Sequence, residues 1–282
     1  MSPQAPVLTN PRADRVRSVR ALSKRPVRDR TGRFAVEGPQ GVREAVRYAA
    51  PRVRDVYLTP EALTRYADDI VEPARAAGLW VHEVTPEVLA AMAETDAPQG
   101  ALAVVDTATG DLDAVLDAGP RLLVLLTHVR DPGNAGTVIR GADAAGADAV
   151  LVSEASVDVH SSKVVRSTAG SLFHLPVVTG LEVAATLQRL RAHGIRSYAA
   201  DGSGTTLLPD ADLSVPHCWV MGNEAWGLDD DARDACDEVV RVPIHGRAES
   251  LNLAMAATVC LYASAAQQAP TAGREAAPPP AR

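Results

Sequence analysis

The chain has 282 residues, which exceeds the usual single-domain length of about 100 to 200, so the sequence predicts two domains and a sizeable core. The formal net charge is −7, which argues against indiscriminate binding to a polyanion. The richest apolar run, residues 122–126, is far shorter than the roughly 20 residues of a membrane-spanning helix, and the N-terminus is polar, so we expect a cytoplasmic protein.

The first residues of the chain are strongly basic. Nine Lys and Arg residues lie between positions 12 and 33, opposed there only by Asp14 and Asp29. Most of them are Arg, whose planar guanidinium suits two-pronged contacts to phosphate. A solvated helix face is the alternative explanation. We favour contact with RNA because residues later in the chain require that substrate, and the candidates are Arg17, Arg20, Arg25 and Arg28.

Residues 1–14 are expected to form a flexible basic head, and residues 15–105 a small α/β domain. Within that domain the pattern predicts a basic helix from Arg15, strands at 34–37, 53–58 and 101–105, and a helix over 41–48. Residues 106–119 are acidic and carry the chain breakers Gly110 and Gly119. They are therefore predicted as a linker, with a domain boundary near residue 115.

Beyond Pro120, apolar runs alternate with helical patterns, which is typical of a mostly parallel sheet covered on both faces. Strands are predicted at 122–129, 149–152, 175–178, 195–200, 218–221 and 239–242. Helices are predicted at 137–145, 161–169, 182–193 and 250–266. This α/β domain is expected to span residues 120–267, and the Ala- and Pro-rich residues 268–282 to form a disordered tail.

Three of the predicted strand ends carry Gly-rich turns with isolated polar side chains. They are DPGNAGTVIR at residues 131–140, MGNEAWGL at 221–228 and VPIHGRAESLN at 242–252. Carboxyl ends of parallel strands are where α/β proteins bind ligands. Each turn alone is also explained as an ordinary strand-to-helix connection, with Asn134 or Ser250 as the helix cap. Their recurrence at three strand ends is what indicates a site.

In order and spacing, these segments resemble the three motifs of the SpoU (TrmH-like) branch of the SPOUT methyltransferases. Residues 163–171 resemble a fourth feature of that branch, and residues 15–105 are similar to its L30e-like substrate-binding domain. The resemblance implies an α/β fold: a C-terminal knotted (SPOUT, trefoil knot) domain with a mostly parallel sheet, plus a smaller N-terminal L30e-like domain. It also implies a homodimer that methylates RNA ribose 2′-hydroxyls with S-adenosyl-L-methionine and needs no metal.

The resemblance further implies which residues form the site. The cofactor pocket would be lined by Ala200, Gly222, Val242, Ile244 and Leu251. The catalytic residues would be Asn134, Arg140, Glu224, Ser250 and Asn252. Arg166 would contact the phosphate or ribose of the RNA, from its own subunit or from the partner.

Arg140 would lie beside the 2′-hydroxyl that is methylated. An arginine guanidinium holds its proton tightly and offers no acceptor, so a general-base role is hard to defend. We therefore hypothesise that Arg140 stabilises the developing alkoxide while the proton passes to a phosphate or to water.

Other functions would require motifs that the sequence lacks, or would not explain the residue set that it contains. A dinucleotide-dependent oxidoreductase needs a Gly-x-Gly-x-x-Gly turn, and the nearest approach, residues 201–204, lacks the third glycine. A non-catalytic RNA- or ribosome-binding protein would not need the catalytic set together. The three cysteines are widely spaced, so we expect reduced thiols and no zinc site. The L30e-like domain and basic head favour 23S ribosomal RNA as the substrate, with transfer RNA as the alternative.

Overall fold

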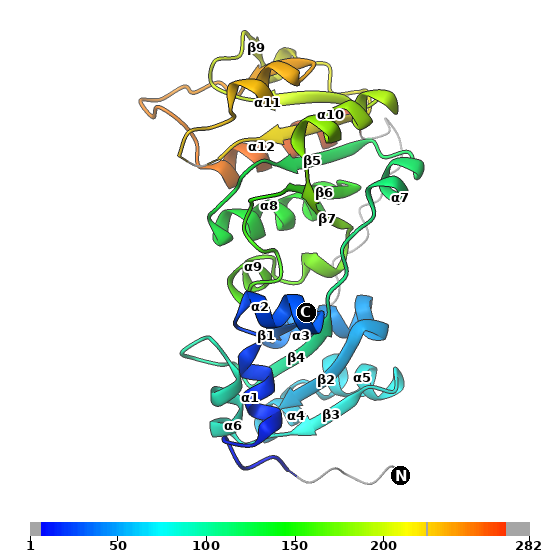
Figure 1. The fold of residues 1–282 in the computed structure, drawn as a ribbon, viewed down its shortest axis with the longest axis vertical. Helices are drawn as coiled ribbons and strands as arrows, with labels where there is room; N and C mark the ends of the chain where they lie inside the picture. Colours follow the sequence, from blue (N-terminus) through cyan, green and yellow to red (C-terminus); the bar gives the residue numbers. More distant parts are fainter. Residues whose placement is uncertain (1–6, 224, 269–282) are drawn as a thin grey trace.

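The computed structural model describes residues 7–223 and 225–268. Figure 1 shows an elongated molecule of two bodies, the N-terminal one below and the C-terminal one above. A four-stranded sheet forms the centre of the first body, and a seven-stranded sheet that of the second. Residues 1–6 of the expected head and residues 269–282 of the expected tail lie outside the described residues.

The N-terminal sheet has the strand order β1-β4-β2-β3, with β4 antiparallel to both of its neighbours and β2 parallel to β3. Its strands are β1 Arg33–Glu37, β2 Val53–Leu58, β3 Trp80–Glu83 and β4 Ala101–Asp106. Its helices are α1 Asp14–Ala21, α2 Arg25–Thr31, α3 Pro39–Ala49, α4 Pro60–Arg65, α5 Glu72–Ala76 and α6 Pro86–Met92, with shorter turns at Ala50–Arg52 and Ala67–Val71.

The basic head differs from the expectation in two ways. The predicted single basic helix is two helices, because α2 starts with Pro26 near its N-terminus and ends at Gly32, whose φ of 62° is left-handed. The backbone at Leu8 is also hydrogen-bonded to the end of β3, through Glu83 O at 2.9 Å and Thr85 N at 3.1 Å. The described part of the head is therefore held against the sheet.

The C-terminal sheet is parallel throughout and has the order β7-β6-β5-β10-β8-β11-β9. Its strands are β5 Leu122–Leu126, β6 Ala149–Ser153, β7 Val177–Leu181, β8 Arg196–Ala200, β9 Thr206–Leu207, β10 His217–Met221 and β11 Glu238–Arg241. The helices are α7 Leu112–Asp117, α8 Pro132–Ala145, α9 Ser162–Ser167, α10 Val183–Ala192, α11 Asp230–Ala235 and α12 Leu253–Gln268, with short turns at Ser171–Phe173 and Leu208–Asp210.

Alternation along the central strands explains why both faces of this sheet are covered. In β5, Val124 and Leu126 belong to the core beneath α8 and α12, whereas Leu123 and Leu125 belong to the core beneath α7 and α10. All of these side chains are fully buried. The parallel sheet covered on both faces that the sequence predicts is confirmed. Helix α7 lies inside the predicted linker 106–119, where Leu112 and Leu116 pack onto the sheet.

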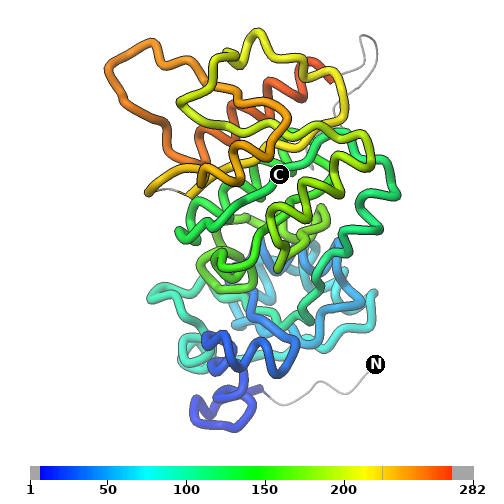
Figure 2. Tube along the Cα trace, turned by 45° about the horizontal axis from the view of Figure 1, so that its top comes forward, coloured from blue at the N-terminus to red at the C-terminus, as the bar shows by residue number. Residues whose placement is uncertain are grey.

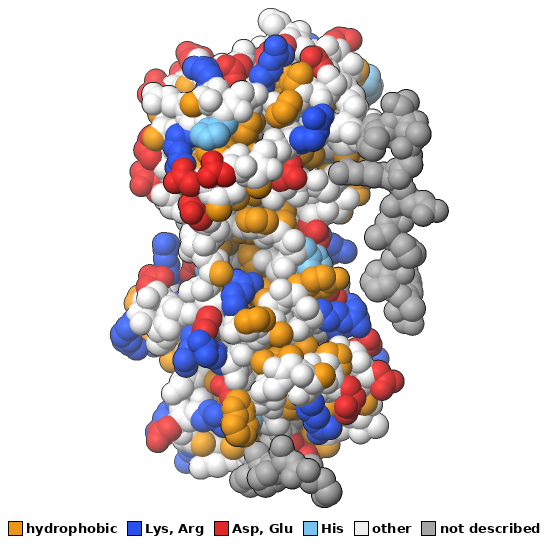
Figure 3. Space-filling model, turned by 90° about the vertical axis from the view of Figure 1, so that its right-hand side faces the viewer, with side chains coloured by type: hydrophobic (Ala, Val, Ile, Leu, Met, Phe, Trp, Pro, Cys, Tyr) orange, Lys and Arg blue, Asp and Glu red, His pale blue; other side chains and the backbone are white. Residues whose placement is uncertain are grey.

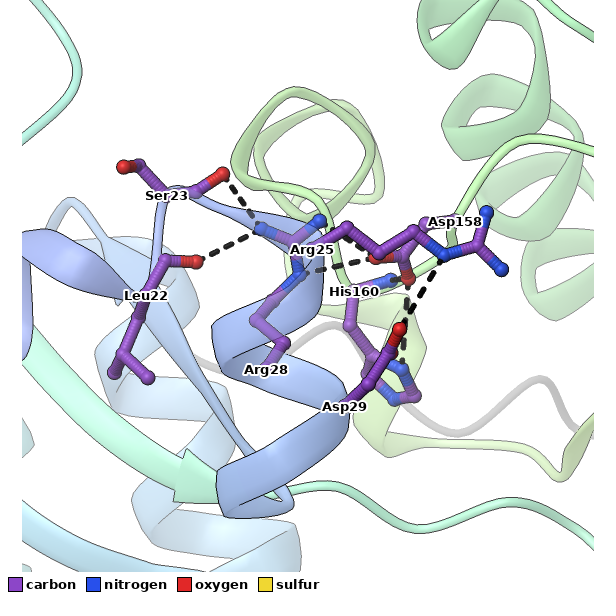
Figure 4. Close-up of polar contacts among 7 residues, drawn as sticks. All are labelled: Leu22, Ser23, Arg25, Arg28, Asp29, Asp158 and His160. Carbon is purple, nitrogen blue, oxygen red and sulfur yellow. Dashed lines mark hydrogen bonds and ion pairs between the residues drawn. The ribbon is translucent and has the colours of Figure 1, made fainter.

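The two bodies share one core and several polar contacts. Phe34 of β1 lies 4.8 Å from the His160 ring and 6.4 Å from the Phe173 ring, measured between centroids. On the face drawn in Figure 3, the molecule narrows where the bodies meet, and hydrophobic side chains are visible there. Figure 4 shows the polar part of the junction, in which Arg28 of α2 binds Asp158 in the loop before α9. The N-terminal body is thus docked on the C-terminal one through packed contacts.

No helix among the described residues is long and apolar enough to cross a membrane. The three cysteines form no disulfide, and burial raises the pKa of Cys236 and of Cys260 to about 12.

Candidate active site

The loops after β8, β10 and β11 meet at one edge of the sheet, since all three strands run in the same direction. Together with the start of α12 they enclose a cavity of about 680 Å³. Figure 2 shows the segment between β11 and α12 (orange) standing out from the body at this edge. The cavity lining includes all five residues expected to hold the cofactor, namely Ala200, Gly222, Val242, Ile244 and Leu251.

Gly222 is required by the shape of the loop after β10. A Cβ placed there would lie 2.2 Å from the carbonyl carbon of Gly227, because the backbone of Asn223 pairs with that of Gly227 through hydrogen bonds of 2.7 and 2.9 Å. No side chain fits this close approach, so the loop presents bare backbone to the cavity. This explains the glycine that the motif contains at this position.

Asn223 ties the same loop to the loop after β5. Its side chain is buried, donates to the carbonyl of His128 at 2.6 Å and accepts from the backbone N–H of Ala225 at 2.8 Å. Sequence reasoning did not assign a role to Asn223, although its place between Gly222 and Glu224 in the motif is a signal that could have pointed to it. Glu224, one of the expected catalytic residues, lies outside the described residues.

Helix α8 starts directly at the predicted motif. Asp131 accepts a hydrogen bond from the backbone N–H of Asn134 at 2.7 Å, and Pro132 occupies the first helical position. The cap is therefore Asp131, and the suggestion that Asn134 caps this helix is wrong. Asp131 thus satisfies the backbone N–H of Asn134, and the side chain of Asn134 takes part in a contact across the site.

That contact is with the third motif. Asn252 Nδ2 donates to Asn134 Oδ1 at 3.0 Å, which joins residues 118 positions apart. The Oδ1 of Asn252 accepts from the backbone N–H groups of Ala254 and Met255 at 2.9 and 3.4 Å, so Asn252 caps α12. The expectation that α12 starts at Ser250 is wrong, because the cap lies two residues later. Ser250 is exposed and lines the cavity beside Asn252.

Arg140 lies on the exposed side of α8 and does not line the cavity. Within the part of the chain that the structure describes, no hydrogen bond or ion pair engages the side chain of Arg140. Its guanidinium is thus available to a ligand. The structure brings Asn134, Ser250 and Asn252 together, and leaves Arg140 on a neighbouring surface.

The predicted RNA contacts divide into exposed and buried residues. Arg17, Arg20 and Arg25 are exposed on α1 and α2. Arg28 is buried and binds Asp158 at 2.6 Å and the carbonyls of Leu22 and Ser23 at 2.8 Å each (Figure 4). The prediction that Arg28 contacts RNA is therefore wrong, because each nitrogen of its guanidinium donates to a group inside the protein.

Arg166 also joins the two bodies. Its guanidinium lies 3.3 Å from the carboxylate of Glu37, which in turn accepts from the backbone N–H groups of Glu94 and Thr95 at 2.9 and 3.1 Å. About a third of the Arg166 side chain stays exposed. Unlike Arg28, it keeps a surface that a ligand could reach.

The cavity also holds charged residues that sequence reasoning missed, among them Asp201, Arg241 and Glu249. Arg241 is the last residue of β11. Because ligands bind at the carboxyl ends of parallel strands, the predicted strand at 239–242 could have pointed to it. Among the described residues, no group of three or more His, Cys, Asp or Glu side chains is arranged to hold a metal ion.

Comparison with known proteins gives consistent matches along the chain. A model of the SpoU rRNA methylase family matches residues 121–262, and one of the MRM3-like substrate binding domain matches residues 13–103. A 23S rRNA (uridine(2479)-2′-O)-methyltransferase from Streptomyces viridochromogenes is 34% identical over 92% of this chain and 90% of that protein. A 23S rRNA (guanosine-2′-O-)-methyltransferase from Bordetella pertussis is 33% identical over 79% of this chain and 93% of that protein.

A solved structure has a similar fold over most of the chain. The AdoMet-bound rRNA methyltransferase from Sinorhizobium meliloti has a TM-score of 0.79 at 29% sequence identity, and the match covers 92% of this chain and 97% of that one.

Proposed function

Because the chain belongs to the SpoU rRNA methylase family, we propose that it methylates a ribose 2′-hydroxyl of 23S ribosomal RNA. It is an S-adenosylmethionine-dependent RNA 2′-O-methyltransferase with the α/β fold of the SPOUT enzymes, and the family implies the trefoil knot. The observation that carries the proposal is the cavity at the ends of β8, β10 and β11, whose lining contains the five expected cofactor residues. The names of the relatives and the match of residues 13–103 to a substrate-binding domain support 23S rRNA.

The cavity fits S-adenosylmethionine in size and chemistry. Its volume of about 680 Å³ lies within the range of about 300 to 1,000 Å³ that small-ligand sites occupy. Ile244 and Leu251, each more than a third exposed, offer apolar side chains to a flat base. Arg241 and Glu249 offer opposite charges to the amino and carboxylate groups of the methionine part. When bound, S-adenosylmethionine supplies a methyl group on an electron-poor sulfonium.

The chain's own residues then orient the ribose and stabilise charge. We assign stabilisation of the developing alkoxide to the guanidinium of Arg140, whose positive charge and N–H donors suit a developing negative oxygen. Asn134 and Asn252, joined by their 3.0 Å hydrogen bond, hold the target nucleotide together with Ser250 and Glu224. The proton of the hydroxyl passes to a phosphate or to water.

In the homodimer that we propose, Arg140 lies at the subunit interface. Helix α12 exposes Met255, Val259 and Tyr262 by 63, 43 and 52%, and their spacing puts them on one face of the helix. Tyr262 Oη donates to the carbonyl of Ala144 at 3.4 Å, so this apolar face borders the exposed side of α8 that carries Arg140. A second copy packed on the face would cover these side chains and receive Arg140 near its own cavity.

Subunit mixing tests this arrangement. An Arg140→Ala protomer and a Gly222→Ala protomer are each expected to be inactive alone. If Arg140 serves the partner's cavity, dimers formed from both regain activity, because one site then combines an intact cavity with an intact Arg140. A mixture that forms heterodimers and stays inactive would contradict the shared site.

The RNA is proposed to lie along the exposed arginines. Arg17, Arg20 and Arg25 of the N-terminal body and Arg166 between the bodies are the phosphate contacts that we retain. In this account the protein acts in the cytoplasm, where ribosomal RNA is made and assembled. Structured RNA is the partner, with transfer RNA as the competing substrate.

A methyl-transfer assay tests the proposed substrate. Radiolabelled S-adenosylmethionine and purified protein are incubated with in vitro transcribed 23S rRNA or with a tRNA pool. The label is expected in 23S rRNA, within a dinucleotide that resists alkaline hydrolysis because the 2′-oxygen is blocked. Label in tRNA alone would contradict 23S rRNA as the substrate, and label that alkali releases as a mononucleotide would contradict ribose methylation.

A further inference from the structure

Trp226 is a large ring left in water at the edge of the active site. It is 57% exposed, whereas Trp219 on the preceding strand is fully buried. Its two neighbours, Ala225 and Gly227, line the methyl-donor cavity. Single exposed apolar side chains are common, so exposure alone identifies no site. The surroundings of Trp226 provide two further observations.

The loop that carries Trp226 is held firmly on both sides of the ring. Before it, Asn223 is buried and pairs with Gly227 through two backbone hydrogen bonds. After it, Leu228 is buried in the core, and Asp229 caps α11 by accepting from the backbone N–H of Ala232 at 2.7 Å. The ring is therefore presented on an anchored turn, which lowers the entropy cost of binding a partner against it.

One face of the ring is covered by a cation. The guanidinium carbon of Arg130 lies 5.1 Å from the Trp226 ring centroid. Arg130 comes from the loop after β5, which Asn223 also contacts through the carbonyl of His128. A guanidinium stacked on one face of an indole leaves the other face for a flat, electron-rich ring.

We propose that Trp226 and Arg130 form a stacking platform for an unpaired base of the RNA at the methylation site. The proposal rests on the proposed function and adds how the target is held. Proteins that recognise RNA outside regular helices target single-stranded loops and bulges, whose splayed-out bases stack on aromatic side chains and Arg planes. Stacking accepts any base, so this platform holds the nucleotide without selecting its identity.

Two variants test the platform against a matched control. Trp226→Ala is expected to raise KM for in vitro transcribed 23S rRNA by roughly 10- to 100-fold, in line with the loss of one base–aromatic stack. Trp226→Phe, which keeps a flat ring, is expected to have a KM much closer to that of the wild type. Trp80→Ala is the control, because Trp80 is also exposed but lies on the edge strand β3 of the other body. Calorimetry should show unchanged binding of S-adenosylmethionine in all three.

Fluorescence gives a readout that a purely structural role would not change. In a Trp80→Phe protein the remaining emitters are the buried Trp219 and the exposed Trp226. Adding 23S rRNA is expected to quench the Trp226 emission by stacking, and the quenched part should vanish when Trp226→Phe is added.

The outcomes separate this proposal from the proposed function. One contrary result is that the wild type methylates 23S rRNA while Trp226→Ala has an unchanged KM, and another is that the Trp226 emission is not quenched. Either result would overturn the platform and leave the proposed function intact. An equal rise in KM in Trp226→Phe and Trp226→Ala would also overturn the platform, because the flat ring of Phe would then not restore RNA binding. A wild-type protein that binds S-adenosylmethionine but does not methylate 23S rRNA would contradict the substrate instead.

Discussion

Arg28 and Asp158 lie 130 positions apart in the sequence and form an ion pair, with 2.6 Å between Nη2 and Oδ2, that joins the two bodies of the molecule. The side chains are only 6 and 16% exposed. The same guanidinium binds the carbonyls of Leu22 and Ser23, so it satisfies the turn between α1 and α2 while it holds the loop before α9 (Figure 4). The substrate-binding body is thereby fixed relative to the catalytic one.

Removing Arg28 should therefore destabilise the protein strongly. Arg28→Ala is expected to lower the free energy of unfolding by roughly 3 to 5 kcal/mol, because it leaves Asp158 largely buried without its counter-ion. Arg25→Ala is the control, since the Arg25–Asp29 pair is exposed at 3.8 Å and should contribute less than about 1 kcal/mol. Urea titration measures both. Equal losses in the two variants would contradict the structural role of Arg28.

The same junction should weaken in acid. Burial alone would raise the pKa of Asp158, but hydrogen bonds from Arg28 and from the backbone N–H of His160 lower it overall. Burial lowers the pKa of His160. Both groups thus bind protons less readily in the folded protein than in the unfolded chain. The contribution of His160 to the free energy of unfolding is complete above its unfolded pKa of about 6.5 and declines below that pH. The contribution of Asp158 is lost below about pH 4.

Thermal unfolding at two pH values tests this sign. The Tm of the wild type is expected to fall when the pH is lowered from 7.5 to 5.5. The Tm of His160→Gln should fall less over the same interval, because Gln does not titrate. If His160→Gln loses as much stability as the wild type over this interval, His160 is not the group that responds.

Asn252 performs two tasks that one substitution can separate. Asn252→Asp keeps an oxygen for the N-terminus of α12 but cannot donate to Asn134. The free energy of unfolding is expected to stay within about 0.5 kcal/mol of wild type, while kcat falls roughly 10- to 100-fold because the donor that fixes the orientation of the Asn134 amide is lost. Asn252→Ala should lose about 1 kcal/mol of stability in addition. Full activity in Asn252→Asp would show that the Asn134 contact is dispensable.

Gly222 and Gly246 offer a matched pair within the cofactor segments. Gly222→Ala is expected to weaken S-adenosylmethionine binding by about 100-fold or more, since its Cβ would meet Gly227 at 2.2 Å and distort the loop. A Cβ at Gly246 meets nothing within 4 Å, so Gly246→Ala should bind as the wild type does. Calorimetry compares the two, and similar affinities would argue against the loop as the binding surface.

Local patterns predicted the central elements well and the junctions poorly. The strands β5, β6 and β10 are largely apolar, and their parallel direction brings the Gly-rich turns to one edge, so residues 118 positions apart could be placed in one site. Nothing near Arg28 distinguishes it from the other basic residues of the head, because its partner Asp158 is distant in sequence. The short edge strands β3 and β9 have no apolar run that could announce them.

The start of α12 shows the same limit on a smaller scale. Ser250 is a good cap by residue type, and the apolar residues that follow it suggest a helix. The structure uses Asn252 instead, since its side chain caps α12 and reaches Asn134 at the same time. Only the tertiary contact decides between the two caps.

The most direct test is mass spectrometry of nuclease digests of 23S rRNA after incubation with S-adenosylmethionine and either the wild-type protein or Arg140→Lys. We predict a 2′-O-methylated nucleotide with the wild type and a rate at least about 100-fold lower with Arg140→Lys, because a lysine cannot reproduce the planar guanidinium beside the alkoxide. S-adenosylmethionine binding should be equal in both. Full methylation by Arg140→Lys, or no 2′-O-methyl nucleotide from a wild-type protein that binds S-adenosylmethionine, would contradict this account.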